Sequence, residues 1–596
     1  MTAMTKTFTM VCLACALPAT GLGVAQSDET AVLPSKAEIR AMHGAPPTIQ
    51  WAVERVAKEL AAVYKINATQ NLEARTPFDD SQRDRAQVFL GVWGRSSVLG
   101  QWCREQGISG VSRKAGSNAY RVTVLRDPLR VVIVGSDDVG AWYGACAWLD
   151  SLKSESAAIV RTPMGEMSGV PALEIRMGRN FDLSPDQEVD SVNSQIPFLD
   201  WYARWRLNFL QYGDVPDARL AAEAHKRGIK TILSLNARSV CASDEKSLAD
   251  MAAQFERFLK DGGDGAAGTW DDVFGERIQG HCERCREKFG PNGITQEIII
   301  ILERLVDVAA KYPGKKYIIW CPPHYTRNRY QELSDEEFFG KVSASEKVRT
   351  VTYMWHTQCG DEPTSFLDRY GMTRRVWWYN GMYPLAEAVA RRRPEPVKSR
   401  IKQQLCNKDF ARFDAVGFIE DVIKTNDVRE IYPPGDAKWK ALRLVSERFQ
   451  GAFGSSDWRS SSYYTGQSGL YAWSPKRFDQ DEADRRLFRA LFGIGSQGPA
   501  RRWSDLENEI EVRLANKLLE GGSLSDSEQR EVAQQMERWH SERVAVEAIV
   551  ARGRSLAEQR LLEPVLRDMR KAEETVAGVV RDLSTTDGTA NKAGGG

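Results

Sequence analysis

Between about residues 170 and 445, short apolar runs alternate with stretches in which apolar residues recur every three or four positions. The short runs predict eight strands, which read LEIRMGRNF, LNFLQYG, IKTILSLN, AAGTWDD, KYIIWCPP, RTVTYMWHT, RRVWWYNG and AVGFIEDV. The intervening stretches, such as DARLAAEAHKRG and EIIIILERLVDVAAKY, predict amphipathic helices. Eight βα units over roughly 270 residues are typical of a (β/α)₈ barrel. A doubly wound sheet is the competing interpretation, but no glycine-rich phosphate loop supports it.

The pattern differs on both sides of this predicted barrel. Residues 30–165 predict a small α/β domain, in which a helix precedes a strand, a pair of strands and a second helix that opens at Asp137. Residues 446–585 predict a helical domain, because long charged stretches with helical periodicity dominate them. Residues 586–596 predict a disordered tail. The expected fold class is therefore α/β, with a (β/α)₈ barrel between a small α/β domain and a helical domain.

The first 25 residues predict a secretory signal peptide, because Lys6 precedes an apolar stretch and small residues around Ala25 follow it. The apolar stretch is short for a membrane span, and no later segment resembles one. We therefore expect an exported protein of the periplasm, cell surface or extracellular space. The net charge of +1 gives no indication of a nucleic-acid partner.

Ten cysteines are too few for a disulfide-stapled scaffold of 596 residues. The sequence His281-Cys282-Glu283-Arg284-Cys285 contains one CxxC pair. A zinc site is one interpretation, but no second pair of ligands lies nearby in the sequence. The favoured interpretation is a local disulfide or two free thiols. We expect no metal or cofactor.

The site of a (β/α)₈ barrel lies at the C-terminal ends of its strands. The fourth predicted strand ends in Asp271 and Asp272, a carboxylate pair that could combine a protonated acid with an ionised group. The alternative is that one Asp caps the following helix. Neighbouring strand ends carry aromatic, imidazole and amide groups, which suit sugar binding. These include His324, Tyr325, Trp355, His356, Trp377, Trp378 and Asn380. For His324 and His356 a structural role in packing is the favoured interpretation, and a hydrogen bond to a ligand is the alternative.

These strand ends resemble glycoside hydrolase family 84, the retaining β-N-acetylglucosaminidases and O-GlcNAcases. The sequence TWDD resembles the Asp-Asp pair on strand 4 of that family, and IIWCPPHY resembles its "CPTEY" motif. The sequences YMWHT and RRVWWYN resemble its "MWTG" and "WWN/WDN" motifs, and YAWSPKRFD resembles "YAWNPxxYD" after the barrel. The motifs are short, so their common order from about residue 30 to 500 carries the resemblance.

The resemblance implies a β-N-acetylhexosaminidase-like hydrolase with a substrate-assisted mechanism, in which the substrate's acetamido oxygen is the nucleophile. Asp271 would orient and polarise the acetamido group, and Asp272 would be the general acid and then the base. Tyr325 would bond near the acetamido group and Asn380 would bind sugar hydroxyls. Trp355, Trp377 and Trp378 are candidate walls of the sugar site, and a core role is the alternative for each.

Two strand ends depart from the family. Strand 1 lacks the "EGFYG" motif, of which only Gly178 or Phe181 could remain. Strand 2 lacks the substrate-binding lysine, and Asp214 or Asp217 is the nearest polar substitute. These departures keep two alternatives open. One is a carbohydrate-binding protein of the same fold with weakened or lost catalysis. The other is a hydrolase of another acidic or acetylated glycan, which a basic pocket around Arg176, Arg179 or Arg204 would support.

Overall fold

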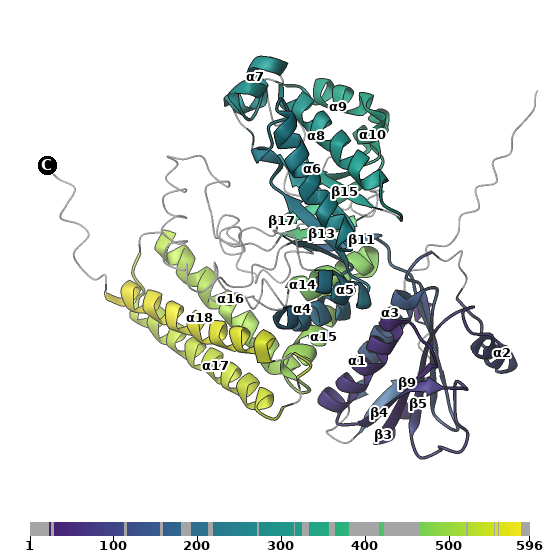
Figure 1. Ribbon diagram of the computed structural model, residues 1–596. Coiled ribbons are helices and arrows are strands. Elements are labelled where there is room, and N and C mark those ends of the chain that lie inside the picture. Colours follow the sequence, from purple (N-terminus) through teal and green to yellow (C-terminus); the bar gives the residue numbers. More distant parts are fainter. Residues whose placement is uncertain are drawn as a thin grey trace, which may run out of the picture.

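The protein is described by a computed structural model (Figure 1). It describes residues 23–24, 29–111, 116–154, 159–179, 192–212, 218–270, 273, 275–291, 293–314, 316–324, 333–356, 364–380, 417–421, 464–519, 522–553, 555–557 and 559–585. The helices and strands form an N-terminal α/β part, a barrel and a group of C-terminal helices (Figure 1).

A seven-stranded mixed sheet organises the N-terminal part, in the order β1-β10-β6-β7-β5-β3-β4. Its strands are β1 (Gly23–Val24), β3 (Lys36–Met42), β4 (Asn67–Ala74), β5 (Ala86–Val92), β6 (Tyr120–Leu125), β7 (Arg130–Gly135) and β10 (Gly165–Gly169). Helices α1 (Pro47–Tyr64) and α3 (Asp138–Ser151) share a hydrophobic core with one face, and α2 (Ser97–Glu105) packs on the other. A small sheet in the order β2-β9-β8 joins Thr30–Val32, Val160–Pro163 and Lys153–Ser154.

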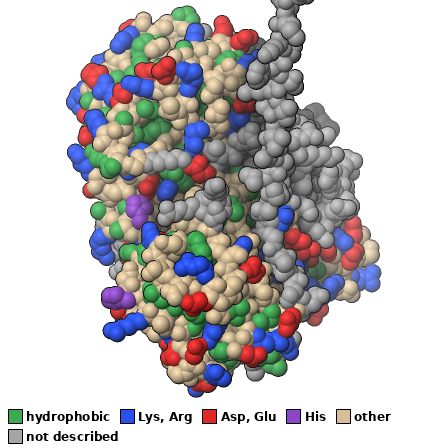
Figure 2. Space-filling model, turned by 90° about the vertical axis from the view of Figure 1, so that its right-hand side faces the viewer, with side chains coloured by type: hydrophobic (Ala, Val, Ile, Leu, Met, Phe, Trp, Pro, Cys, Tyr) green, Lys and Arg blue, Asp and Glu red, His purple; other side chains and the backbone are tan. Residues whose placement is uncertain are grey.

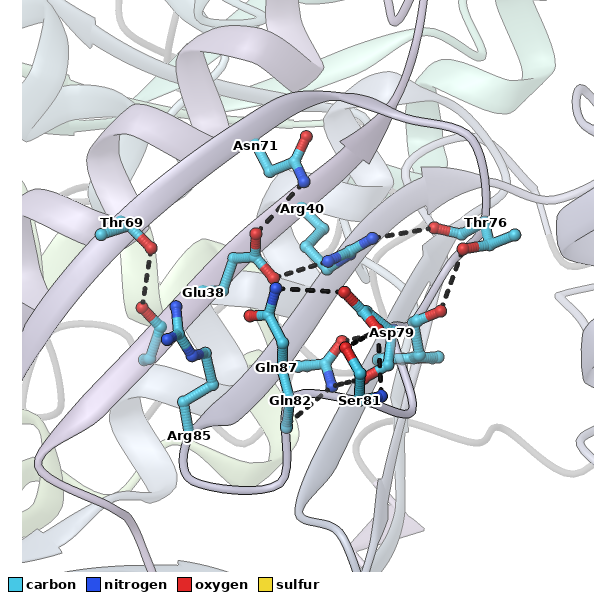
Figure 3. Close-up of polar contacts among 12 residues, drawn as sticks. Glu38, Arg40, Thr69, Asn71, Thr76, Asp79, Ser81, Gln82, Arg85 and Gln87 are labelled. Carbon is cyan, nitrogen blue, oxygen red and sulfur yellow. Dashed lines mark hydrogen bonds and ion pairs between the residues drawn. The ribbon is translucent and has the colours of Figure 1, made fainter.

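The edge of this sheet carries buried polar groups that form hydrogen bonds and an ion pair with one another (Figure 3). On β3 the apolar residues face α1, and the alternate positions Glu38 and Arg40 face away and are joined by an ion pair of 2.5 Å. The Asn71 amide of β4 donates to Glu38, and Arg40 donates to the backbone oxygen of Thr76. Bonds of this kind offset the cost of burying polar groups, so the loop after β4 can cover the sheet.

The central part is a closed barrel of eight parallel strands in sequence order, which confirms the predicted fold class. The strands are β11 (Ile175–Arg179), β12 (Phe209–Tyr212), β13 (Lys230–Leu235), β14 (Gly265–Thr269), β15 (Tyr317–Cys321), β16 (Thr352–His356), β17 (Arg375–Asn380) and β18 (Gly417–Asp421). Each overlaps one of the eight predicted apolar runs. The predicted barrel limits, 170 and 445, stay predictions, because residues 422–463 lie outside the described part.

Helices cover the outside of the barrel between the strands (Figure 1). They are α4 (Val192–Arg204), α5 (Ala218–Lys226), α6 (Glu245–Lys260), α7 (Glu283–Phe289), α8 (Gly293–Ala310), α9 (Asp335–Ala344) and α10 (Glu346–Arg349). The apolar faces of α6 to α10 and the outward side chains of β13 to β16 share a hydrophobic cluster, as expected for amphipathic crossover helices. The apolar residues of α4 and α5 instead join the hydrophobic core of the N-terminal part.

Five α-helices make up most of the described C-terminal part. They are α14 (Tyr464–Trp473), α15 (Gln480–Phe492), α16 (Gln497–Leu519), α17 (Asp526–Val550) and α18 (Gln559–Thr585). The last three lie side by side (Figure 1), and Trp503 of α16 stacks on Trp539 of α17 at 5.6 Å between ring centroids. Ser525 and Glu528 form a capping box that fixes the start of α17.

Among the described residues, no helix has the length and apolar character that a membrane crossing needs. On the face drawn in Figure 2, basic and acidic side chains are intermixed, in keeping with the net charge of +1. The predicted signal peptide, apart from Gly23–Val24, and the predicted tail 586–596 lie outside the described residues.

Candidate active site at the barrel rim

Alternating strand residues fill the barrel interior with apolar side chains. The interior cluster consists of Ile175, Met177, Phe209, Ile232, Ala267, Tyr317, Ile319, Cys321, Met354 and Val376. Because all eight strands are parallel, their C-terminal ends meet at one rim, and the loops that follow them surround the same space. The rim is therefore the candidate site.

The segment before the predicted carboxylate pair is held firmly. Thr269 pairs with Cys321, and the backbone N–H of Trp270 donates to the Cys321 oxygen at 2.8 Å. The Trp270 side chain is buried in the outer layer, edge-on to Trp320 at 6.3 Å between ring centroids. Asp271 and Asp272 follow Trp270 directly and lie outside the described residues, so their roles stay predictions.

The end of β15 leads to His324, a histidine that the sequence offered as either a ligand contact or a packed residue. Its ring is 1% exposed, stacks on Phe338 at 4.4 Å between centroids, and bonds the Leu333 oxygen through Nε2. The hydroxyl of Tyr353 donates to the His324 backbone oxygen. These contacts indicate a structural role. The candidate Tyr325 follows it and lies outside the described residues.

Register brings the remaining candidate positions to the same rim. Trp355 of β16 pairs with Trp377 of β17, and the next residue, His356, pairs with Trp378. Asn380 pairs with Asp421 of β18, and Asp421 pairs with Arg179 of β11. The backbone positions 380, 421 and 179 therefore lie at one level at the C-terminal end of the barrel. Their side chains lie outside the described part of the chain, and the sugar-binding roles stay predictions.

Gly178, the candidate remnant of the strand-1 motif, lies on the outer side of β11. A Cβ built there would be 2.1 Å from the hydroxyl of Tyr202 in α4. Glycine at this position therefore permits the close packing of α4 on the barrel. A direct contact with a sugar could come only from its backbone, and its substrate-binding role stays a prediction. The candidate Asp214 lies outside the described residues.

Gln211 of β12 is an interior polar residue that the sequence analysis did not single out. It is 2% exposed, lies two residues after the interior Phe209, and donates from Nε2 to Ser234 Oγ of β13 at 2.8 Å. Its Oε1 is buried, and no described group donates a hydrogen bond to it. A buried amide oxygen of this kind is suited to accept a ligand hydroxyl. The available signal was one amide side chain, Gln211, within the otherwise apolar and aromatic stretch Phe209–Tyr212.

Two of the three arginines that could have marked a basic pocket lie outside the barrel interior. Arg204 forms ion pairs with Glu59 of α1 and Asp150 of α3, at 2.9 and 2.8 Å. Arg176 donates to the Tyr143 hydroxyl and to the backbone oxygens of Arg206 and Leu173. Burial lowers the pKa of Arg176 from its usual value. Both residues join the barrel to the N-terminal part, so neither supports the basic pocket expected of a hydrolase of another acidic glycan.

Two overlapping groups of described residues bring metal-binding atoms within 4.8 Å of one another. One consists of Cys241, Cys282 and Cys285, and the other of His281, Cys285 and Glu297. They lie in the segments that follow β13 and β14, close in sequence to the rim.

The fold and rim define a (β/α)₈-barrel protein with an N-terminal α/β part and C-terminal helices. No protein-family model and no curated protein matches the sequence. Among solved structures, CpGH84B has a TM-score of 0.55 at 12% identity, with 94% of this chain and 89% of that chain covered. For CpGH84D the TM-score is 0.52 at 11% identity, with 94% and 92% covered. For a GH138 enzyme targeting pectin rhamnogalacturonan II, the TM-score is 0.49 at 13% identity, with 92% and 70% covered.

The chain therefore has the fold of CpGH84B and CpGH84D over nearly its whole length. Both names carry the label of glycoside hydrolase family 84, which the strand-end motifs resemble. The resemblance read from the motifs is thus confirmed at the level of the fold.

Proposed function

We propose that the chain is an exported, retaining glycoside hydrolase that acts on N-acetylated amino sugars. The observation that carries the proposal is the end of β14. The backbone N–H of Trp270 donates a hydrogen bond to the Cys321 oxygen there, which fixes the strand end. Asp271 and Asp272 are the next two residues in the sequence. The fold shared with CpGH84B and CpGH84D supports the same class of enzyme.

In the proposed mechanism the substrate supplies the nucleophile. The acetamido oxygen attacks the anomeric carbon while Asp271 orients and polarises the acetamido group through its nitrogen. Asp272 donates a proton to the leaving oxygen, and then removes a proton from the water that opens the cyclic intermediate. Two displacements at the anomeric carbon retain its configuration. Tyr325 and Asn380 would bind the substrate, with Trp355, Trp377 and Trp378 as walls.

Gln211 extends this proposal to the second strand, where the family lysine is missing. Its buried Oε1 lies inside the barrel beside Ser234, where it can accept a hydrogen bond from a sugar hydroxyl. An uncharged acceptor also fits a neutral amino sugar better than a sugar acid, since a carboxylate would be repelled by a carbonyl oxygen.

The test is turnover of 4-nitrophenyl β-N-acetylglucosaminide and the matching galactosaminide by the full chain and its variants. Asp271→Asn is expected to lose turnover of every substrate by at least about a hundredfold, because the acetamido group is no longer polarised. Asp272→Asn is expected to lose much less with 4-nitrophenol than with an alkyl alcohol as leaving group, because only poor leaving groups need the acid. Proton NMR should show the β-anomer as first product.

Asp307→Asn is the matched control, since Asp307 of α8 is half-exposed and pairs with Lys347 of α10, both on helices outside the barrel. It should leave turnover unchanged. Folded wild type that releases no 4-nitrophenol but binds N-acetylglucosamine would instead indicate the carbohydrate-binding protein. Turnover of other glycans only would indicate the third alternative. Export is supported by the first 25 residues, and would be refuted by a cytoplasmic product whose mass includes them.

A further inference from the structure

Three cysteines from two different segments meet near the barrel rim. Cys241 follows β13, whereas Cys282 and Cys285 lie at the start of α7, beyond β14. Cys241 Sγ lies 3.4 Å from Cys282 Sγ and 3.7 Å from Cys285 Sγ. A disulfide bond would bring two sulfurs to about 2.05 Å. The three side chains are therefore separate thiols that face one another.

The separations between the sulfurs match a shared metal ion. In a tetrahedral zinc site each Zn–S bond is about 2.3 Å long, which places two thiolate sulfurs about 3.8 Å apart. All three sulfurs here lie within 4.8 Å of one another. Three thiolates around one point favour a soft ion such as Zn²⁺ over Mg²⁺ or Ca²⁺, which prefer oxygen ligands.

An imidazole lies within 4.8 Å of the Cys285 thiol and is already oriented. His281 Nδ1 and Glu297 Oε2 are 2.8 Å apart, and the His281 backbone N–H donates to Glu297 Oε1 at 3.0 Å. Glu297 belongs to α8 and is fully buried. A carboxylate that holds one ring nitrogen leaves the other for a metal, an arrangement that recurs around zinc-bound histidines.

Gly280 makes this approach possible. Its φ is +142°, and a Cβ built on it would lie 2.8 Å from Glu297 Oε1. A side chain at this position would therefore push Glu297 away from His281. The backbone is shaped to bring the buried carboxylate and the imidazole together.

We propose that Cys241, Cys282 and Cys285 bind one Zn²⁺ ion as thiolates, with the imidazole of His281 as the fourth ligand and Glu297 orienting it. Binding releases the three thiol protons to solvent and leaves no bond to be oxidised or reduced. Four protein ligands without an open position make this a structural site.

The proposed ion joins the segment after β13 to the segment after β14. The latter begins with Asp271 and Asp272, so the chain between Trp270 and Cys282 would be held at both ends. The metal site itself does not depend on the proposed hydrolase activity, because its test measures metal.

The experiment is metal analysis of the purified full chain, produced with zinc in the medium and kept from chelators. About one zinc ion per chain is expected. Reduced, metal-free chain titrated with Co²⁺ should develop sulfur-to-cobalt charge-transfer absorption and the intense visible bands of tetrahedral Co²⁺, which Zn²⁺ abolishes. Cys241→Ser and Cys282→Ser should retain less than about a tenth of the metal, because each removes a ligand.

Cys103→Ala is the matched control, since Cys103 is a buried free thiol in the N-terminal part. It should keep the full metal content. If the cysteine-to-serine variants fail to fold, the cobalt spectrum of the wild-type chain decides alone. Folded wild type without zinc and without the cobalt spectrum after reduction would overturn the proposal, as would a disulfide between Cys241 and Cys282 in the native protein.

Discussion

At the scale of single residues, the barrel interior combines an apolar floor with a few polar groups toward the rim. Phe209 meets Tyr317 edge-on at 4.8 Å between ring centroids. Two residues further along β12, the Gln211 amide donates a hydrogen bond to Ser234. An apolar interior excludes water, so each polar group that remains has greater weight in binding. Gln211 is the described interior residue best placed to test the proposed sugar site.

Gln211→Leu should lower kcat/KM for the amino-sugar substrate about five- to tenfold, because one hydrogen bond to an uncharged group contributes roughly 1 kcal/mol. Leucine has a similar volume and preserves the packing of β12. Gln101→Leu, which removes an exposed amide from α2, is the control and should change kcat/KM less than twofold. An unchanged kcat/KM in Gln211→Leu, with an unchanged thermal midpoint, would exclude a contact with the substrate.

At the scale of elements, caps and glycines set where the helices begin. The sequence predicts that a helix opens at Asp137, and α3 starts there with Asp137 as its N-cap. Its carboxylate accepts from the backbone N–H of Gly140 and of Asn118, each at 2.7 Å. A Cβ on Gly140 would lie 2.3 Å from the Ala119 oxygen, so glycine lets α3 lie tightly against β6.

Asp137→Ala should lower the stability of the N-terminal part by about 1–2 kcal/mol, because two backbone N–H groups lose their acceptor. Differential scanning calorimetry should show a thermal midpoint lower by about one to two degrees, because the whole chain unfolds together and its entropy of unfolding is large. Asp138→Asn is the control: Asp138 pairs with an Arg95 that is more than half exposed, so its loss should change stability by less than about 0.5 kcal/mol. Equal midpoints for the two variants would refute the capping role.

At the scale of the whole molecule, buried ion pairs join the three parts. The carboxylate of Asp150 in α3 forms ion pairs with Arg204 and Arg206, each with an N–O distance of 2.8 Å, and with Arg486 of α15 at 3.5 Å. Asp200 of α4 receives Arg55 of α1 at 2.8 Å and Arg227 at 2.7 Å. Removing one member of such a network leaves a buried charge without its partner, which costs several kcal/mol. The N-terminal part, the barrel and the C-terminal helices should therefore unfold together.

Asp150 also predicts how stability depends on pH. Burial raises the pKa of its carboxyl, but Arg204 and Arg206 outweigh burial and hold the pKa well below its usual value. The unfolded chain therefore binds the proton more readily, and this contribution to stability is present above about pH 4 and is lost as pH falls further.

Asp150→Asn should lower the thermal midpoint at pH 7, because two buried guanidinium groups lose their carboxylate, and its midpoint should fall less steeply below about pH 4 than that of wild type. Calorimetry across this range is the measurement. The control is Asp250→Asn, which removes an exposed partner of Lys246 and should follow wild type at each pH. Parallel pH profiles for wild type and Asp150→Asn would contradict the assignment.

Local patterns were sufficient for the barrel. The eight apolar runs became β11 to β18 because strand and helix periods are encoded by neighbouring residues. The same reading missed β3 and β4 of the N-terminal sheet. In β4 only Ala74 is buried, and in β3 the buried Glu38 and Arg40 interrupt the apolar pattern, so neither strand shows clear apolar character along the sequence.

The sequence alone determined the class of fold and the strand ends around the rim, since each depends on residues close together in the chain. Only the tertiary structure decided what distant residues do. Arg176 and Arg204 were candidates for a basic pocket, but both contact the N-terminal part instead. Arg204 pairs with Glu59 of α1 and Asp150 of α3, and Arg176 donates to Tyr143 of α3. Cys241, 41 residues before Cys282, joined a cysteine pair that by itself favoured a disulfide or free thiols. Residues that meet only in the folded chain show no characteristic spacing in the sequence. The contact between Cys241 and Cys282 therefore depends on how the βα loops pack around one rim.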